Sequence, residues 1–187
     1  MGDPKRLALI GGTFDPVHGG HIGIARAAQE TLDLDQVRFL PCRQSPHKQD
    51  RASSASTHRL AMLRLATQGL SWAKVDAFEL HQDLPSYSWR TAEAFRQRYP
   101  HSKLYWIMGT DQWQALERWA NWERLAELVH FIVFQRGEFP RARNNIEATF
   151  IEGQFDISAT EIREGDRDSS LSLPSVDRYI RDHGLYQ

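Results

Sequence analysis

The chain has 187 residues, of which 41% are hydrophobic and 25% charged, a composition typical of a soluble globular protein with a sizeable core. Its formal net charge of −1 argues against a protein that binds nucleic acid through a basic surface. A single cysteine, Cys42, excludes an intrachain disulfide, and the apolar run 7–10 is too short for a signal sequence or a membrane span. We therefore expect a cytoplasmic protein without membrane or nucleic-acid partners.

Hydrophobic spacing predicts strands that alternate with helices. In chain order we expect a strand over 6–10, a helix over 19–32, a strand over 37–40, a polar loop over 43–57, a helix over 58–67, a strand over 72–75, a helix over 88–98, a strand over 104–108, a helix over 111–128, a strand over 131–134 and a helix over 175–182. This alternation predicts a single α/β domain over 1–187, a Rossmann-like, doubly wound parallel sheet with helices on both faces. Ligands of such sheets bind beyond the carboxyl ends of the strands, which the turns 11–20 and 109–111 should both reach.

The segment GGTFDPVHGGHI follows the first predicted strand and carries the clearest chemical signal. Gly11 and Gly12 allow backbone N–H groups to approach a ligand closely. The helix predicted from Gly19 presents unpaired N–H groups and the positive end of its dipole. His18 and His21 are one turn apart and can donate to the same phosphate. The segment therefore favours an anion site.

Two other interpretations of this segment stay open on these residues alone. Glycines after a strand are often a structural turn, and two histidines three residues apart can be part of a zinc site. Zinc needs a third ligand, and no further Cys or His lies close in the sequence. The common nucleotide-binding patterns GxxxxGK[ST] and GxGxxG are both missing from the sequence.

The segment GTFDPVHGGH resembles the signature of nucleotidyltransferases with an HxGH motif, which transfer AMP or CMP from a nucleoside triphosphate to a phosphate group. Such a family has a second motif near the C-terminus, and ISATEIR at 157–163 resembles it. By itself, this segment predicts a helix whose capping box runs from Ser158 to Glu161, with Arg163 as a surface residue or an anion ligand. In the family the corresponding ISSTxIR segment binds the β- and γ-phosphates of ATP. Ser158, Thr160 and Arg163 match it, while Ala159 replaces the second serine.

Further segments resemble the nicotinate-nucleotide adenylyltransferases in particular. They are SPHK at 45–48, SYSWRT at 86–91, IMGTD at 107–111 and LERW at 116–119. Together with a closing segment at 176–186, they extend the resemblance over almost the whole chain. Lys48 lies in a polar loop, where it is either a solvated side chain or a flexible cation that could close over a triphosphate. In this family a tryptophan at the position of Trp119 stacks on the nicotinate, and backbone N–H groups near Ser88 and Trp119 receive its carboxylate.

The resemblance implies transfer of AMP from ATP to nicotinate mononucleotide, giving nicotinate adenine dinucleotide and pyrophosphate in NAD biosynthesis. It implies Mg²⁺ bound with ATP rather than by protein ligands, and an enzyme that is a monomer or a small homo-oligomer. The implied catalytic residues are His18, His21 and Arg163. The implied ATP-binding residues are Gly11, Gly12, Thr13, Phe14, Lys48, Gly109, Asp111, Ser158 and Thr160. The implied nicotinate nucleotide-binding residues are Ser88, Trp89 and Trp119.

Other functions compete with this interpretation. The same centre could use nicotinamide mononucleotide or phosphopantetheine as acceptor, or CTP as donor. A second class is a regulatory protein that binds ATP without turnover, against which the charged groups Lys48 and Arg163 argue. The missing GxGxxG disfavours a third class, a dinucleotide-dependent oxidoreductase.

Overall fold

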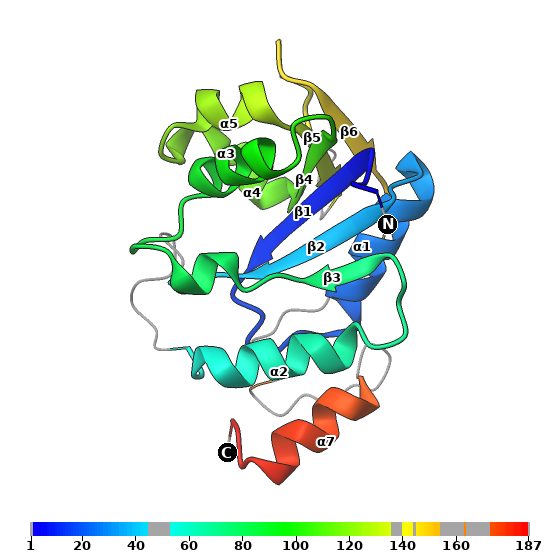
Figure 1. Cartoon of the computed structure of the whole chain (residues 1–187), viewed down its shortest axis with the longest axis vertical. Coiled ribbons are helices and arrows are strands. Elements are labelled where there is room, and N and C mark those ends of the chain that lie inside the picture. Colours follow the sequence, from blue (N-terminus) through cyan, green and yellow to red (C-terminus); the bar gives the residue numbers. More distant parts are fainter. Residues whose placement is uncertain are drawn as a thin grey trace.

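The computed structural model describes residues 2–44, 53–135, 140–143, 145–153, 163 and 173–186. Within these ranges, six strands form one sheet in the order β3-β2-β1-β4-β5-β6, and all neighbouring strands are parallel (Figure 1). The strands are β1 (Arg6–Gly12), β2 (Gln36–Pro41), β3 (Ala73–Val75), β4 (Lys103–Gly109), β5 (His130–Phe134) and β6 (Ala148–Ile151). The order reverses its direction between β1 and β4, which makes the carboxyl ends of these two strands the switch point of the sheet.

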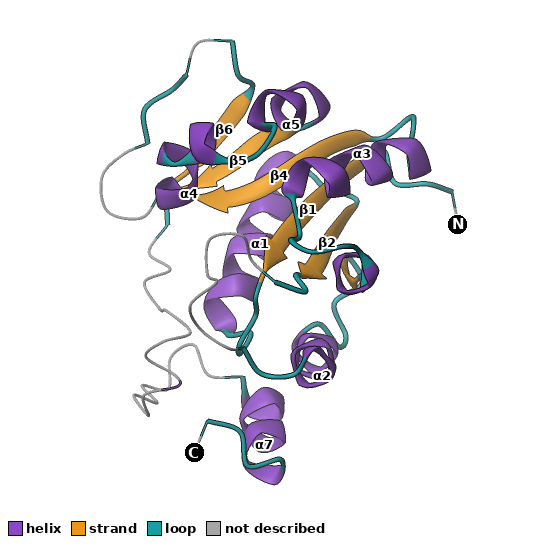
Figure 2. Ribbon diagram, turned by 90° about the vertical axis from the view of Figure 1, so that its left-hand side faces the viewer, coloured by secondary structure: helices purple, strands orange, loops and turns teal. Residues whose placement is uncertain are grey.

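Helices cover both faces of this sheet, which confirms the predicted doubly wound fold (Figure 2). One face packs against α1 (Gly19–Leu32), α2 (Ser56–Ala66) and α7 (Pro174–Asp182). The other packs against α3 (Ser88–Arg98), α4 (Thr110–Gln114) and α5 (Trp122–Leu128). Two short 3₁₀ helices, η1 (Phe78–His81) and η2 (Leu116–Arg118), lie in the connections. None of the described helices is long and apolar enough to cross a membrane.

Strand β1 shows why the sequence encodes a sheet buried on both faces. Leu7 and Leu9 pack into the core under α3, α4 and α5, whereas Ala8 and Ile10 pack into the core under α1, α2 and α7. Because successive side chains of a strand point to opposite faces, a continuous apolar run is what a central parallel strand requires.

Strand β6 was not among the predicted elements. It lies at the edge of the sheet, where it pairs with β5 from Phe131↔Ala148 to Phe134↔Ile151. Only Ile151 of its four residues is buried. A short strand that buries so little has a weak hydrophobic pattern. This segment forms a strand because it pairs with β5, and its own sequence gives little indication of it.

The prediction of one continuous helix over 111–128 was wrong. The segment folds as α4, η2 and α5, and α5 is preceded by Asn121 with φ of 49°. The Arg143 guanidinium donates from Nη2 to the carbonyls of Trp113 at 3.0 Å and Gln114 at 3.1 Å. A distant arginine therefore binds carbonyls that a continuous helix would bond internally.

Candidate active site

Two of the predicted turns lie side by side at the switch point of the sheet. β1 ends at Gly12 and β4 ends at Gly109, and the two strands are paired through Leu9↔Trp106. The expectation that both turns reach the same edge is therefore confirmed (Figure 2). A ligand at this edge meets the turn after β1, the amino end of α1 and the amino end of α4.

Aromatic rings pack closely against the two glycines of the first turn. A Cβ at Gly12 would lie 3.1 Å from the Phe14 ring, and a Cβ at Gly11 would lie 3.3 Å from the Trp106 ring. Phe14 itself has φ of 51°, in the left-handed region that L side chains rarely adopt. A side chain at either glycine would therefore displace an aromatic ring of the turn or of β4.

The two histidines meet at the amino end of α1. His18 is the residue before the helix and is 3% exposed, while His21 is half-buried. Their ring centroids are 3.8 Å apart. The His18 backbone N–H donates to His21 Nδ1 at 3.3 Å, which places the proton of a neutral His21 ring on Nε2. Two imidazoles and a helix amino end converge here, an arrangement that suits a phosphate.

Arg163 brings the C-terminal motif to this turn. Its Nη1 donates to the Asp15 carbonyl at 2.5 Å, although the two residues are 148 positions apart. The predicted capping box from Ser158 to Glu161, which includes the ATP-binding candidates Ser158 and Thr160, lies outside the described residues. Lys48 also lies outside them. The hydrogen bond between Arg163 and Asp15 therefore joins the two distant motifs.

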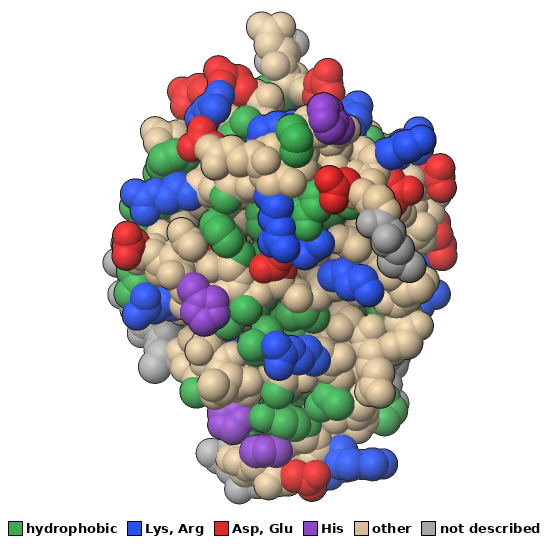
Figure 3. All heavy atoms as spheres, in the orientation of Figure 1, with side chains coloured by type: hydrophobic (Ala, Val, Ile, Leu, Met, Phe, Trp, Pro, Cys, Tyr) green, Lys and Arg blue, Asp and Glu red, His purple; other side chains and the backbone are tan. Residues whose placement is uncertain are grey.

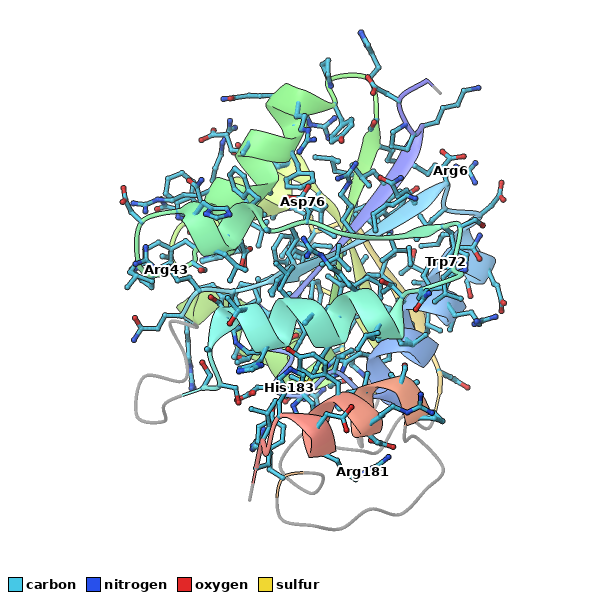
Figure 4. All side chains as sticks on the ribbon, turned by 60° about the horizontal axis from the view of Figure 1, so that its bottom comes forward. Arg6, Arg43, Trp72, Asp76, Arg181 and His183 are labelled. Carbon is cyan, nitrogen blue, oxygen red and sulfur yellow. The ribbon has the colours of Figure 1, made fainter. Side chains whose placement is uncertain are left out.

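Asp15 also joins the first turn to the C-terminal segment, a role that the sequence pattern did not reveal. Its Oδ2 accepts from the Ser54 backbone N–H at 3.1 Å, and its Oδ1 accepts from the Tyr186 hydroxyl. Burial, with the hydrogen bond to Asp15, raises the pKa of the Tyr186 hydroxyl above its ordinary value. Helix α7, which precedes Tyr186, lies beside α2 (Figure 4), where the Tyr179 hydroxyl is 3.0 Å from His58 Nδ1.

Arg59 was not among the predicted site residues, yet it contacts the first turn. It lies in the first turn of α2 and is 1% exposed. Its guanidinium donates to the carbonyls of Thr13 and Cys42, the residues that follow the glycines of β1 and the end of β2. A signal was present, because Arg59 precedes the buried Met62 and Leu63 by one helical turn and so lies on the core side of its helix.

The candidates for the second substrate gather on the other face of the sheet. Ser88 is the first residue of α3 and is half-buried. Trp89 and Trp119 are also half-buried, and both pack against the core cluster beneath α3, α4 and α5. Unlike the buried Trp113, these two tryptophans are only partly buried.

Asp111, a candidate for ATP binding, is exposed on the first turn of α4. It comes shortly after Gly109, the last residue of β4.

A hydrogen bond fixes the entry to α3 beside this region. The Arg43 backbone N–H, just after β2, donates to the Ser86 hydroxyl at 3.1 Å. Arg43 also donates from Nη1 to the Gln82 carbonyl at 3.3 Å, and it lies next to the segment that leads into α3 (Figure 4). The start of α3 is therefore held against the carboxyl end of β2.

A buried carboxyl lies beneath this second region. Glu79 is 4% exposed, and its Oε1 accepts from the Thr91 hydroxyl of α3 at 2.8 Å. Burial raises the pKa of Glu79 to about 7, although the Thr91 hydrogen bond acts in the opposite direction. Burial also raises the pKa of the nearby Cys42 thiol.

The Glu79 pKa predicts a stability that falls as pH rises. The folded state holds the Glu79 proton more tightly than the unfolded state, whose pKa is near 4.5. The contribution is complete below pH 4.5 and is lost as pH rises through 7, a change of about 3 kcal/mol in the free energy of unfolding. The free energy of unfolding, measured with urea, should be lower at pH 8 than at pH 5 in the wild type, and this difference should disappear in Glu79→Gln. Glu123→Gln, at an exposed position, is the control and should keep the difference. An equal difference in wild type and Glu79→Gln would contradict the prediction.

Comparison with known proteins agrees with this geometry. Residues 9–165 match the family model described as cytidylyltransferase-like. A probable nicotinate-nucleotide adenylyltransferase of Methylacidiphilum infernorum is 36% identical, over 97% of this chain and 92% of the relative. The nicotinate-nucleotide adenylyltransferase of Bacillus subtilis is 33% identical, over 98% of this chain and 99% of the relative. A similar solved structure is the nicotinic acid mononucleotide adenylyltransferase of Plasmodium falciparum complexed with NaAD, with a TM-score of 0.81, 18% identity and 97% of both chains covered.

Proposed function

Because the chain belongs to the nicotinate-nucleotide adenylyltransferase family, we propose that it transfers AMP from ATP to nicotinate mononucleotide. The products are nicotinate adenine dinucleotide and pyrophosphate, a step of NAD biosynthesis. The observation that carries the proposal is the meeting of Arg163 with the first turn, beside His18 and His21 at the amino end of α1. Three cationic or proton-donating side chains and a helix amino end at one sheet edge suit a polyphosphate.

The reaction needs positioning and charge stabilisation more than a strong base. The phosphate of the mononucleotide is already a nucleophile, and it attacks the α-phosphorus of ATP in line as the bond to pyrophosphate breaks. We assign His18 and His21 to the α- and β-phosphate oxygens, where their N–H groups donate to charge that develops in the transition state. The backbone of Gly11, Gly12, Thr13 and Phe14 lines the same phosphates.

Arg163 is assigned to the departing pyrophosphate, together with Ser158 and Thr160. Its guanidinium is already directed to this turn through the Asp15 carbonyl. A planar fork binds two phosphate oxygens at once, which favours a leaving group that gains charge. Lys48 is proposed as a further cation for the triphosphate.

The proposed nucleoside contacts follow the strand ends. Asp111, exposed after Gly109 at the carboxyl end of β4, is assigned to the adenosine ribose hydroxyls. Ser88, Trp89 and Trp119 are assigned to the nicotinate nucleotide. The two tryptophans are only partly buried, which supports stacking on the pyridine.

Mg²⁺ fits the proposal as a cation that arrives with ATP. Mg²⁺ prefers oxygen ligands and keeps several waters, whereas His18 and His21 offer imidazole nitrogens and both oxygens of the Asp15 carboxylate already accept hydrogen bonds. The phosphate oxygens of ATP are therefore its proposed ligands, and the bound cation would neutralise part of their charge.

The proposal includes one domain over 1–187, action in the cytoplasm as a monomer or small homo-oligomer, and small molecules as the only partners. The joining of the described strands into one sheet supports a single domain. Acidic and basic side chains are interspersed on the face shown in Figure 3, which does not resemble the basic stripe of a nucleic-acid binder.

The test is pyrophosphate release with ATP and Mg²⁺, measured in parallel with nicotinate mononucleotide, nicotinamide mononucleotide and phosphopantetheine. We expect rapid release with the nicotinate form. Release with only one of the other acceptors would overturn the assigned substrate but keep the chemistry. No release with any acceptor would overturn the transferase assignment and favour an ATP-binding regulator.

The stacking assignment predicts a selective effect on one substrate. Trp119→Ala should raise KM for nicotinate mononucleotide about tenfold, because an aromatic contact is lost, and leave KM for ATP unchanged. Trp119→Phe should keep most of the affinity. Trp122→Ala is the matched control, since Trp122 is also half-buried against the same core cluster. Equal KM values for the mononucleotide in the two alanine variants would remove Trp119 from the site.

A further inference from the structure

We propose that Arg59 is a positioning residue for the phosphate-binding turn, a role that rests on the ATP site proposed above. Arg59 is in α2, outside the segments that carry the family resemblance, and its side chain is almost fully buried. It holds the turn after β1 and the chain after β2 in one fixed arrangement, so that the turn is ready for a triphosphate before ATP binds.

The Arg59 guanidinium joins three separate stretches of backbone. Nη1 donates to the Thr13 carbonyl at 2.8 Å and to the Cys42 carbonyl at 2.9 Å, and Nε donates to the Ser54 carbonyl at 3.0 Å. Thr13 directly follows Gly12, and the Cys42 backbone N–H in turn donates to the Gly12 carbonyl at 2.9 Å. The planar fork of an arginine can hold several carbonyls in fixed directions. Arg59 therefore fixes the turn from its buried side.

Arg59 also places a positive charge next to this turn. Its three hydrogen bonds to Thr13, Cys42 and Ser54 all go to neutral carbonyls. No carboxylate in the described ranges lies within 4.0 Å of its nitrogens. Two carboxyls lie in the same region: Asp15 accepts from the Ser54 backbone N–H, and Glu79 acts with Arg59 on the Cys42 thiol. Glu79 has a pKa of about 7 and so carries only part of a charge at neutral pH. A buried cation is costly unless it is compensated, and a bound polyphosphate would supply that compensation.

Arg96 offers a close comparison at the opposite edge of the same sheet. Its Nη1 donates to the Ser102 carbonyl at 2.7 Å, and its Nη2 donates to the Leu128 carbonyl at 2.9 Å. These carbonyls precede β4 and β5, whereas those of Thr13 and Cys42 follow β1 and β2. Both arginines therefore link backbone segments at strand ends by donating to carbonyls. Of the two, Arg59 does so at the carboxyl ends of the strands, where ligands of this fold bind.

The expected consequence follows from the geometry of phosphoryl transfer. The N–H donors of the turn act only if they already point to the phosphate when ATP arrives, and a misplacement of about 1 Å costs about 10²-fold in rate. Loss of Arg59 should therefore weaken ATP binding and slow the chemical step, not only lower stability. Loss of Arg96 should lower stability alone.

The experiment compares Arg59→Met and Arg96→Met at a temperature where circular dichroism shows both to be folded. We expect Arg59→Met to raise the Kd for ATP, measured by calorimetry, about tenfold and to lower kcat about 10²-fold, with KM for nicotinate mononucleotide unchanged. Arg96→Met should lower Tm and leave Kd and kcat at their wild-type values. Values of Kd and kcat in Arg59→Met equal to those in Arg96→Met would overturn the proposal.

A second variant and an independent readout keep this test decisive. If Arg59→Met does not fold, Arg59→Lys retains the cation but not the planar fork, and it should show a smaller loss in the same direction. Wild-type Kd and kcat in Arg59→Lys would overturn the role of the fork. If the wild-type chain binds ATP but releases no pyrophosphate with nicotinate mononucleotide, the proposed function fails, while the comparison of Kd values still decides the role of Arg59.

Discussion

His18→Ala should lower kcat for pyrophosphate release by about 10²–10³-fold, the loss expected when one transition-state donor is removed. The side chain is 3% exposed and lies against His21 at the amino end of α1. Its donors are therefore fixed in place and shielded from water, the conditions under which a hydrogen bond to developing charge is strongest. KM for ATP should change much less than kcat, since the interaction strengthens only in the transition state.

Steady-state kinetics with saturating ATP and nicotinate mononucleotide checks this prediction. The exposed His101→Ala is the matched control and should keep wild-type turnover. Circular dichroism of His18→Ala shows whether the buried site tolerates the smaller side chain. A folded His18→Ala enzyme with near-normal kcat would remove His18 from the catalytic residues.

The second large effect is expected at Arg163. Arg163→Ala should lower kcat/KM for ATP by about 10²–10³-fold, because the variant loses the charged fork that binds the leaving pyrophosphate. It also loses the hydrogen bond that Nη1 donates to the Asp15 carbonyl. Arg163→Lys should recover only part of the activity, since a lysine keeps the charge without the bidentate geometry.

The readout for Arg163 is the rate of pyrophosphate release over a range of ATP concentrations. Arg178→Ala removes an exposed arginine from α7 and should leave kcat/KM unchanged. Inorganic pyrophosphate should inhibit the wild-type enzyme more strongly than Arg163→Ala. Equal inhibition of both enzymes would show that Arg163 does not hold the leaving group.

The fold was largely predictable because most of its elements bury a regular face. The apolar run of β1 and the spacing of Ile22, Ala25 and Ala28 in α1 report burial through local sequence alone. β6 and the break between α4 and α5 were not predictable in this way. One depends on pairing with β5 and the other on carbonyl contacts with Arg143, and neither interaction leaves a periodic signal.

The residues of the candidate site divide in the same manner. One short segment contains Gly11, Gly12, His18 and His21. Its turn and the start of α1 bring these residues together independently of the rest of the fold. The sequence by itself therefore predicted an anion site in this segment, and it determined the alternation of strands and helices and the family to which the motifs belong.

Only the tertiary structure decided which distant groups meet this segment. The contacts from Arg59, Arg163 and Tyr186 to the turn after β1 span 46, 148 and 171 positions, respectively. Periodicity records that a side chain is buried but not against what, because the partner depends on how α2 and α7 pack on the finished sheet. The helical spacing of Arg59 indicates that it lies on the core side of α2, but only the packing shows that it supports the proposed phosphate site.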